Sequence, residues 1–210
     1  MTRLAIVGCG LIGAKRARAA AGATPAVFAD LSRDRAEALS AQFPGSEATE
    51  DWKAAVTRDD VDVVVVATPH DSLAEIGLAA IEAGKHVLIE KPAARSADEL
   101  RPLLDAAKAR DVRVRVGFNH RYHKAFLKAH ELVAEGVLGP LMFLRARYGH
   151  GGRIGYDKEW RSKPEISGGG ELIDQGVHLI DLSRSFLGDF TEVDGYAHTY
   201  FWDMSVDDNA

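Results

Sequence analysis

Short apolar segments recur along the first half of the chain, separated by amphipathic stretches. Residues 3–7 (RLAIV), 26–30 (AVFAD), 61–68 (VDVVVVAT), 86–90 (HVLIE) and 112–118 (VRVRVGF) have the pattern of strands. The stretch 61–68 is almost entirely β-branched, which is typical of a strand covered on both faces in a parallel sheet. These segments therefore predict the core strands of one sheet.

The intervals between these strands predict helices, most of which end near glycine or proline. They cover residues 14–22, 33–43, 51–56, 71–83 and 96–110. Ser96 and Glu99 have the spacing of a capping box at the start of the last helix. Strands that alternate with helices in this way predict an α/β fold, a doubly wound parallel sheet over residues 1–118.

The pattern changes after residue 118 and predicts a short second, α+β domain over residues 119–210. Its predicted elements are a helix at 123–135, a long strand at 141–149, a polar loop at 150–170, a helix at 171–187 and a strand-like stretch at 192–204.

Composition narrows the classes of partner. The chain has 210 residues, 46% of them hydrophobic, which is enough for a sizeable core. A net charge of −5 without a basic cluster argues against nucleic acid or a membrane surface as partner. One cysteine allows no internal disulfide, and the first residues enter a strand directly rather than a signal peptide, so we expect a cytoplasmic protein. We assign no metal site.

The turn after the first strand has the spacing Gly8-x-Gly10-x-x-Gly13. Between a strand and a helix this is the dinucleotide fingerprint: a tight turn, close backbone approach to a pyrophosphate, and close packing of helix on strand. The backbone N–H groups of Leu11 and Ile12 at the helix start would meet the pyrophosphate. Three turn glycines by chance are the alternative, but the strand–helix–strand context favours cofactor binding.

Asp30 ends the second strand, where a carboxylate can accept hydrogen bonds from an adenosine ribose. A 2′-phosphate beside Asp30 would meet a like charge, which favours NAD as cofactor. Ser32 and Arg33 follow and could receive a phosphate, so NADP stays open.

Further candidate cofactor contacts follow two core strands at the edge where open α/β sheets bind ligands. Thr68 and Pro69 come after one strand, and Glu90 and Lys91 after the next. Lys91 precedes a proline, which fixes the turn and can follow a cis peptide bond. The alternative is that Lys91 is an ordinary solvated lysine.

The predicted helix at 171–187 places Asp174, His178 and Asp181 on one narrow face. The alternative is that this face is simply the wet side of an amphipathic helix. Aspartate and histidine are poor helix formers there, however, and Gly176 in the interior costs about 1 kcal/mol relative to alanine. We therefore predict a functional Asp174–His178 pair, with His178 as proton acceptor because an imidazole titrates near neutral pH.

The order of three motifs resembles the glucose–fructose oxidoreductase, inositol dehydrogenase and rhizopine-catabolism family. The motifs are GxGxxG at 8–13, EKP at 90–92, and GGGxLxDxGxHxxD at 168–181. The resemblance implies an NAD(P)-binding Rossmann domain, a second domain whose open sheet forms a homo-oligomer, and oxidation or reduction at a hydroxyl-bearing carbon of a sugar, inositol or nucleotide-sugar.

The resemblance also implies roles for particular residues. The family's catalytic lysine, aspartate and histidine correspond to Lys91, Asp174 and His178. GFNHRY at 117–122 and EWR at 159–161 resemble segments near the family's active site. The candidate substrate or nicotinamide contacts are Asn119, Arg121, Trp160 and Arg161.

One departure from the family concerns the end of the chain. In the family more strands follow a VxDNA-like segment, whereas here the chain ends at VDDNA, so we expect a shortened second domain with an exposed sheet edge. A naturally short homologue is the alternative. Two other functions stay open: a non-catalytic sugar or cofactor sensor on the same scaffold, and an NAD-dependent glycosidase.

Overall fold

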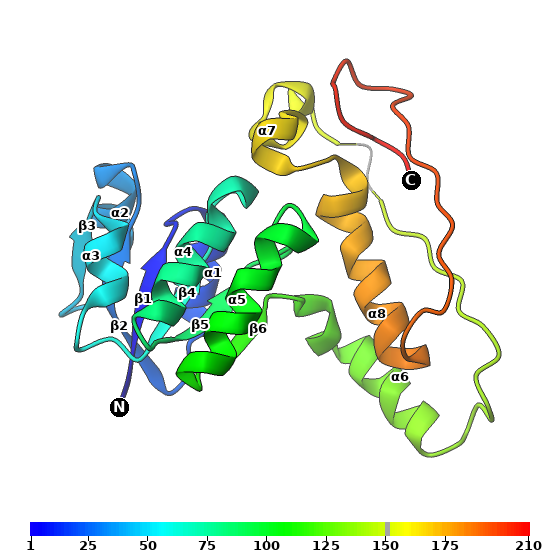
Figure 1. The fold of residues 1–210 in the computed structure, drawn as a ribbon, viewed down its shortest axis with the longest axis horizontal. Coiled ribbons are helices and arrows are strands. Elements are labelled where there is room, and N and C mark those ends of the chain that lie inside the picture. The colour runs from blue at the N-terminus through cyan, green and yellow to red at the C-terminus, as the bar shows by residue number, and fades with distance from the viewer. Residues whose placement is uncertain (150–151) are drawn as a thin grey trace. The chain divides into compact units, whose positions relative to one another are not determined.

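The structure is a computed structural model that describes residues 1–149 and 152–210 (Figure 1). It contains two compact units, Met1–Gly117 (unit 1) and Phe118–Ala210 (unit 2).

Unit 1, all of whose residues are described, contains a six-stranded parallel sheet with the order β3-β2-β1-β4-β5-β6. The strands are β1 (Thr2–Val7), β2 (Ala23–Ala29), β3 (Glu47–Thr49), β4 (Val63–Val66), β5 (His86–Ile89) and β6 (Val114–Val116). The predicted doubly wound sheet is therefore confirmed, with the short β3 as an added edge strand. The order reverses between β1 and β4, so the carboxyl ends of these neighbouring strands mark the switch point where such sheets bind ligands.

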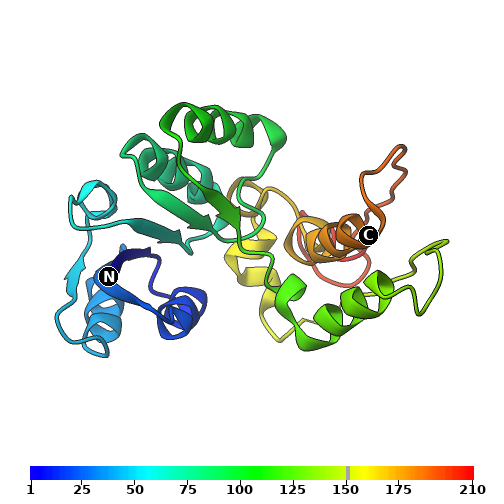
Figure 2. The same ribbon diagram turned by 90° about the horizontal axis from the view of Figure 1, so that it is seen from below.

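Helices cover both faces of this sheet (Figures 1 and 2). Alternation along β1 divides the core: Leu4 and Ile6 pack with α1 (Leu11–Ala19) and α2 (Arg33–Ser40). The intervening Ala5 and Val7 face the opposite layer. That layer holds α3 (Trp52–Thr57), α4 (His70–Glu82) and α5 (Ala97–Arg110).

Polar side chains begin three of these helices. Ser32 caps α2, Asp51 caps α3, and Ser96 caps α5, each by accepting a hydrogen bond from a backbone N–H in the first turn. A cap of this kind is worth about 1 kcal/mol. The predicted helix start at Ser96 is therefore confirmed.

The regular elements in the described part of unit 2 are all helical. Its elements are η1 (Asn119–Tyr122), α6 (Lys124–Ala134), η2 (Tyr156–Lys158), η3 (Trp160–Ser162), α7 (Pro164–Ser167), the π-helical turn η4 (Leu172–Gly176) and α8 (Val177–Leu187). Helices α6 and α8 lie side by side in both views, and the rings of His130 and Phe186 stack between them with centroids 3.8 Å apart. The two predicted helices of this half are confirmed.

The predicted strands at 141–149 and 192–204 are wrong for the described part of unit 2. There the only ladder-type pairing is a single antiparallel bridge between His198 and Asn209. Both segments contain residue types that favour strands. In the described residues, however, neither segment pairs with a neighbouring strand. Residues 150–151, at the start of the predicted loop, lie outside the described residues.

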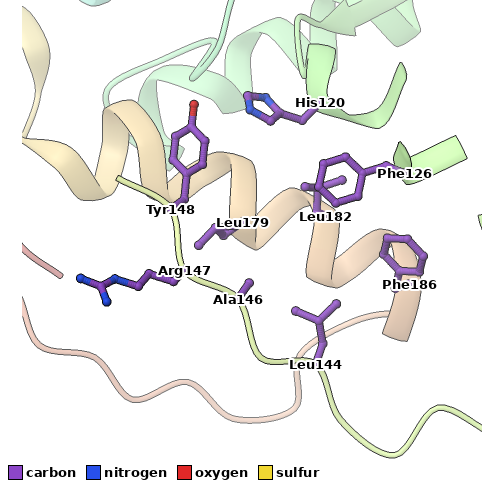
Figure 3. A pocket seen from close by; sticks show the side chains of 9 residues that line it. All are labelled: His120, Phe126, Leu144, Ala146, Arg147, Tyr148, Leu179, Leu182 and Phe186. Carbon is purple, nitrogen blue, oxygen red and sulfur yellow. The ribbon is translucent and has the colours of Figure 1, made fainter. Parts of the chain in front are cut away.

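The extended segment 141–149 still keeps the alternation of a strand. Leu144, Ala146 and Tyr148 line a pocket of about 250 Å³ together with side chains from α6 and α8 (Figure 3). Arg147, although counted among the lining residues, extends away from this apolar cluster. The hydrophobic period therefore selects which side chains approach the helices even where no strand forms.

None of the helices in the described residues is both long enough and apolar enough to cross a membrane.

Candidate active site

Two of the three fingerprint glycines in unit 1 are required by the fold itself. Gly8 has a φ of 93°, and a Cβ built there would lie 2.5 Å from the carbonyl oxygen of Ala67 on the chain leaving β4. A Cβ on Gly13 would lie 1.9 Å from the carbonyl oxygen of Gly8. These two glycines therefore let the turn close and let α1 pack against it.

Gly10 has no such internal reason, because a Cβ built there would meet no described atom within 4 Å. It is the N-cap residue of α1 and is exposed, as are Leu11 and Ile12 in the first turn. The open space lies where the unpaired N–H groups of the helix start attract an anion. This part of unit 1 suits a pyrophosphate whose approach a side chain at position 10 would obstruct.

Asp30 ties the end of β2 to the glycine turn. Its carboxylate accepts hydrogen bonds from the backbone N–H of Cys9 at 2.8 Å and of Ser32 at 2.8 Å. The guanidinium of Arg35 pairs with the same carboxylate at 3.0 Å. An ionised carboxylate has about four acceptor positions, so these contacts leave capacity for a ribose hydroxyl.

The two predicted phosphate ligands beside Asp30 have partners within unit 1. The Ser32 hydroxyl caps α2, and Arg33 forms an ion pair with Glu37 at 2.7 Å. Arg35, which the sequence reasoning missed, forms an ion pair with the Asp30 carboxylate. It could have been found from its place one turn into the helix that follows β2.

Cys9 lies inside the glycine turn and is buried. Burial, together with the nearby Asp30 carboxylate, raises the pKa of its thiol to about 12. The thiol is therefore uncharged at neutral pH and acts as a small packing group.

The predicted residues after β4 and β5 lie at the same carboxyl edge of the sheet. Thr68 accepts a hydrogen bond from the Ser72 hydroxyl at 2.9 Å, and Pro69 is the N-cap residue of α4. Lys91 is partly buried, and the Lys91–Pro92 peptide bond is cis. Glu90 precedes it at the end of β5 and is buried.

Glu90 forms an ion pair with Arg16 from α1, which the sequence reasoning missed. A Cβ on Gly117 would lie 2.8 Å from the Glu90 carboxylate and 2.9 Å from the Arg16 guanidinium, so a larger residue there would displace this ion pair. Glu90, the residue before Lys91, thus lies between Arg16 of α1 and Gly117 after β6. This arrangement fixes the start of the EKP turn.

In unit 2 the polar face of the 171–187 helix is buried. Asp174, His178 and Asp181 are 3%, 5% and 8% exposed, whereas the apolar residues Leu172 and Ile180 are 43% and 47% exposed. The wet-face alternative is therefore wrong. Burying three ionisable side chains is costly unless each has partners.

Arginines supply partners for both carboxylates. Arg161 from η3 approaches Asp174 at 3.1 Å, and Gln175 donates to the same carboxylate at 3.0 Å. Arg121 from η1 donates two hydrogen bonds to Asp181, at 2.7 and 2.6 Å. The bond to Asp181 raises the pKa of Arg121 above its ordinary value.

His178 is surrounded by rings. Its imidazole centroid lies 3.9 Å from that of His120, and 6.2 Å from those of Phe118 and Tyr148. Asn119, a predicted substrate contact, is exposed and its amide oxygen lies 3.1 Å from His120 Nδ1. Trp160, another predicted contact, stacks on the Arg161 guanidinium at 4.5 Å.

The GGG motif before this helix is held by the VDDNA segment. The Asp207 carboxylate accepts hydrogen bonds from the backbone N–H groups of Gly170 at 2.9 Å and Leu172 at 2.8 Å. The backbone carbonyl of Asp207 accepts from Glu171 at 2.9 Å. A Cβ on Gly170 would lie 1.8 Å from that carbonyl oxygen, which explains this glycine. The sequence reasoning used both motifs but did not link them.

Unit 2 thus brings together Asp174, Arg161 and Trp160 on one side and His178, His120 and Asn119 on another. The nearby pocket includes His120 and Tyr148 in its lining but neither Asp174 nor His178, so we treat it as space beneath the extended segment. No group of three or more candidate metal ligands occurs among the described residues.

A Rossmann sheet with this glycine turn, followed by a unit with a buried Asp–His pair, defines the class of protein. A family model described as "Oxidoreductase family, NAD-binding Rossmann fold" matches residues 2–118, and the "GFO/IDH/MocA C-terminal domain" model matches residues 126–210. The chain belongs to the GFO/IDH/MocA oxidoreductase family, as its motifs indicated.

Relatives with assigned activities are similar over most of this chain. Levoglucosan dehydrogenase of Pseudarthrobacter phenanthrenivorans is 33% identical over 83% of this chain and 45% of its own length. Inositol 2-dehydrogenase of Rhodococcus erythropolis is 33% identical over 88% of this chain and 52% of its own. The chain spans about half the length of these curated relatives.

Solved structures show the same fold. A levoglucosan dehydrogenase in complex with NADH and levoglucosan superposes with a TM-score of 0.85 at 29% identity, covering 99% of this chain and 61% of that one. A 3-ketoreductase from Actinomadura kijaniata in complex with NADP and TDP-benzene gives a TM-score of 0.78 at 29% identity, covering 89% and 57%.

Proposed function

We propose that this protein is an NAD(P)-dependent oxidoreductase. It transfers a hydride between the nicotinamide and a hydroxyl-bearing carbon of a sugar, an inositol or a nucleotide-sugar. The observation that carries the proposal is the buried Asp174–His178 face, since a helix does not bury two such ionisable groups for packing alone. The named activities of the relatives support the substrate class.

We propose that unit 1 holds the cofactor. Gly8, Gly10 and Gly13 with the N–H groups of Leu11 and Ile12 would bind the pyrophosphate, and Asp30 the adenosine ribose. Thr68, Pro69, Glu90 and Lys91 would line the nicotinamide half. The open space at Gly10 supports this assignment. Bound NAD supplies a hydride acceptor, and the carboxylate at position 30 favours NAD over NADP.

We propose separate roles for three catalytic side chains. His178 accepts the proton from the substrate hydroxyl, because histidine is the side chain that most often serves as a general base near neutral pH. Asp174 stabilises the imidazolium and orients the hydroxyl, with its own charge shared with Arg161. Lys91 holds the reacting oxygen and stabilises the alkoxide charge as it develops.

Substrate contacts in this proposal come from the segments around the helix. Trp160 and Arg161 offer a flat cation–aromatic surface of the kind that suits a sugar ring. Asn119 is exposed and able to bond a hydroxyl. Arg121 belongs to the same group, although its two bonds to Asp181 also give it a structural role.

The wider setting belongs to the same proposal. We propose that residues 1–118 act as the cofactor domain and residues 119–210 as the substrate and oligomerisation domain of a homo-oligomer. We place the protein in the cytoplasm, since its one cysteine is a buried, uncharged thiol that needs no oxidising compartment.

A panel of sugars, inositols and nucleotide-sugars, followed by NADH absorbance, tests the reaction. On the substrate found, His178→Gln and Lys91→Ala are each expected to lower turnover by about 100-fold to 10,000-fold with little change in NAD affinity. Lys108→Ala and His198→Gln, which remove an exposed lysine and an exposed histidine, are the matched controls and should leave turnover unchanged.

The outcomes separate the competing functions. Near-normal turnover in both variants would refute the site and favour the sensor. Tight NAD binding with cleavage of a glycoside and no net NADH would favour the glycosidase. Circular dichroism of each variant shows that a loss of turnover is not a loss of folding.

A further inference from the structure

We propose that His120 is a positioning residue whose imidazole keeps the ring of His178 uncharged. The two rings belong to separate elements of unit 2, His120 to η1 and His178 to α8. Their centroids lie 3.9 Å apart with the ring planes inclined by 42°. At this separation a proton on one imidazole strongly opposes a proton on the other.

The surroundings of the two rings strengthen this opposition. Tyr148 packs edge-on against His120 at 5.3 Å, and Phe118 packs edge-on against His178 at 6.2 Å. His178 itself is 5% exposed. Because these rings displace water, little solvent remains to screen a charge on either imidazole.

The charged groups on the neighbouring elements come as two ion pairs. Asp174, one turn before His178, pairs with Arg161, and Asp181, one turn after it, pairs with Arg121. His120 and Tyr148 are the titratable rings that contact His178. With both carboxylates paired, His120 is the neighbour whose charge changes as the pH falls through the range in which His178 titrates.

Two coupled imidazoles take up their protons in two steps. The first proton goes to His120, which is only partly buried, and the second is then disfavoured at the buried His178. His178 therefore stays neutral, and able to accept a proton, to a lower pH than it would alone. This role rests on the proposed function only where it concerns catalysis, because the coupling itself is a property of unit 2.

A histidine NMR titration of the full 210-residue chain tests the coupling without any substrate. His178→Gln removes one set of ring resonances and so assigns His178. In the unaltered protein, the His178 resonances are expected to move with the titration of His120. In His120→Phe, which keeps a ring but removes the titrating group, the pKa of His178 should rise by about one unit.

Two matched variants serve as controls. His130→Phe removes a different imidazole, which stacks on Phe186 of the same helix, and Tyr148→Phe removes only a hydroxyl. Neither should move the pKa of His178. If His120→Phe fails to fold, His120→Gln replaces it in the test, because glutamine also places an uncharged side chain at position 120.

An unmoved His178 pKa in a folded His120 variant, or a His178 curve without an inflection from His120, overturns the proposal. On a confirmed substrate, the acid limb of the turnover profile should shift upward with the pKa in His120→Phe. Should the NMR coupling be present and no substrate be turned over, the coupling stands and the proposed function fails. Loss of turnover with an unmoved pKa refutes the role given to His120.

Discussion

Asp30 has a structural role in the turn and, in the proposed function, a second role as the group that binds the cofactor's ribose. Its carboxylate closes the turn by accepting from the N–H groups of Cys9 and Ser32, and it pairs with Arg35. A 2′-phosphate bound here would therefore meet both a carboxylate and a largely exposed guanidinium. We expect both residues to affect the choice between NAD and NADP.

Asp30→Ala is expected to narrow the preference for NAD over NADP by about tenfold, because it removes the like charge and leaves Arg35 for the phosphate. Arg35→Ala should widen the preference, because Asp30 then keeps its full charge. Titration of both cofactors against each variant gives the ratio of dissociation constants. Arg33→Ala, whose ion pair is with Glu37, is the control and should leave the ratio unchanged.

A clear preference for NADP in the unaltered protein would contradict this account of Asp30. So would parallel changes of the ratio in Asp30→Ala and Arg35→Ala. Loss of binding for both cofactors in Asp30→Ala would show instead that its bonds to the turn dominate.

At the scale of elements, the start of the helix that carries Asp174 and His178 depends on a segment more than thirty residues further along the chain. Asp207 bonds three successive backbone N–H groups there, two through its carboxylate and one through its carbonyl oxygen. The helix opens with a π-helical turn, and such turns are frequent at functional sites. Because Asp207 holds the residues at the start of this helix, its bonds also affect the position of Asp174.

Gly169 and Gly170 are adjacent residues in the segment that Asp207 holds. Substitution by alanine should lower the stability of the protein by different amounts at the two positions. The Cβ of Gly170→Ala would lie 1.8 Å from the Asp207 carbonyl oxygen, so the backbone must move, at a cost of more than about 2 kcal/mol in the free energy of unfolding. The Cβ of Gly169→Ala would lie 3.2 Å from the Ile173 side chain, which can adjust for less than about 1 kcal/mol. Denaturant unfolding measures both.

Equal stability of the two alanine variants would show that Asp207 does not hold this turn. Asp207→Asn provides a second comparison, because an amide oxygen can still accept one of the two side-chain bonds. It should fall between the unaltered protein and Asp207→Ala in stability.

The sequence predicted the elements of unit 1 well because each is specified locally. The β-branched run of β4 and the caps at Ser32, Asp51 and Ser96 identify their elements within a few residues. The segments 141–149 and 192–204 have equally suitable patterns but form no strand in the described residues. A strand depends on a partner that its own sequence does not encode.

The candidate site shows the same division. Spacing within one short segment predicted Gly8 and Gly13, which belong to the motif at 8–13. It also predicted Asp174 and His178, which belong to the motif at 168–181. The contacts of other site residues were not predicted: Glu90 pairs with Arg16, Asp30 with Arg35, His178 packs on His120, and Gly170 bonds to Asp207. Spacing within one motif does not show which residue of another segment the fold brings into contact.

At the scale of the whole molecule, the apolar side chains of unit 2 raise the question of association. Phe143 is 76% exposed and Phe201 is 78% exposed, and Met142 and Val193 are more exposed still. A buried phenylalanine removes roughly 150–250 Å² from water. Large apolar side chains with this much exposure are candidates for burial against another chain.

We therefore expect the protein to self-associate through unit 2, with a concentration-dependent mass in analytical ultracentrifugation. Phe143→Asp combined with Phe201→Asp should weaken association by at least about tenfold, because burying a charge at a packed apolar contact is costly. Leu31→Asp makes the same chemical change at a residue of unit 1 that is 84% exposed, and it should leave the mass unchanged. A monomeric unaltered protein at every concentration would refute the expectation. Equal weakening by Leu31→Asp would show that association is a general effect of exposed apolar surface and not a property of unit 2.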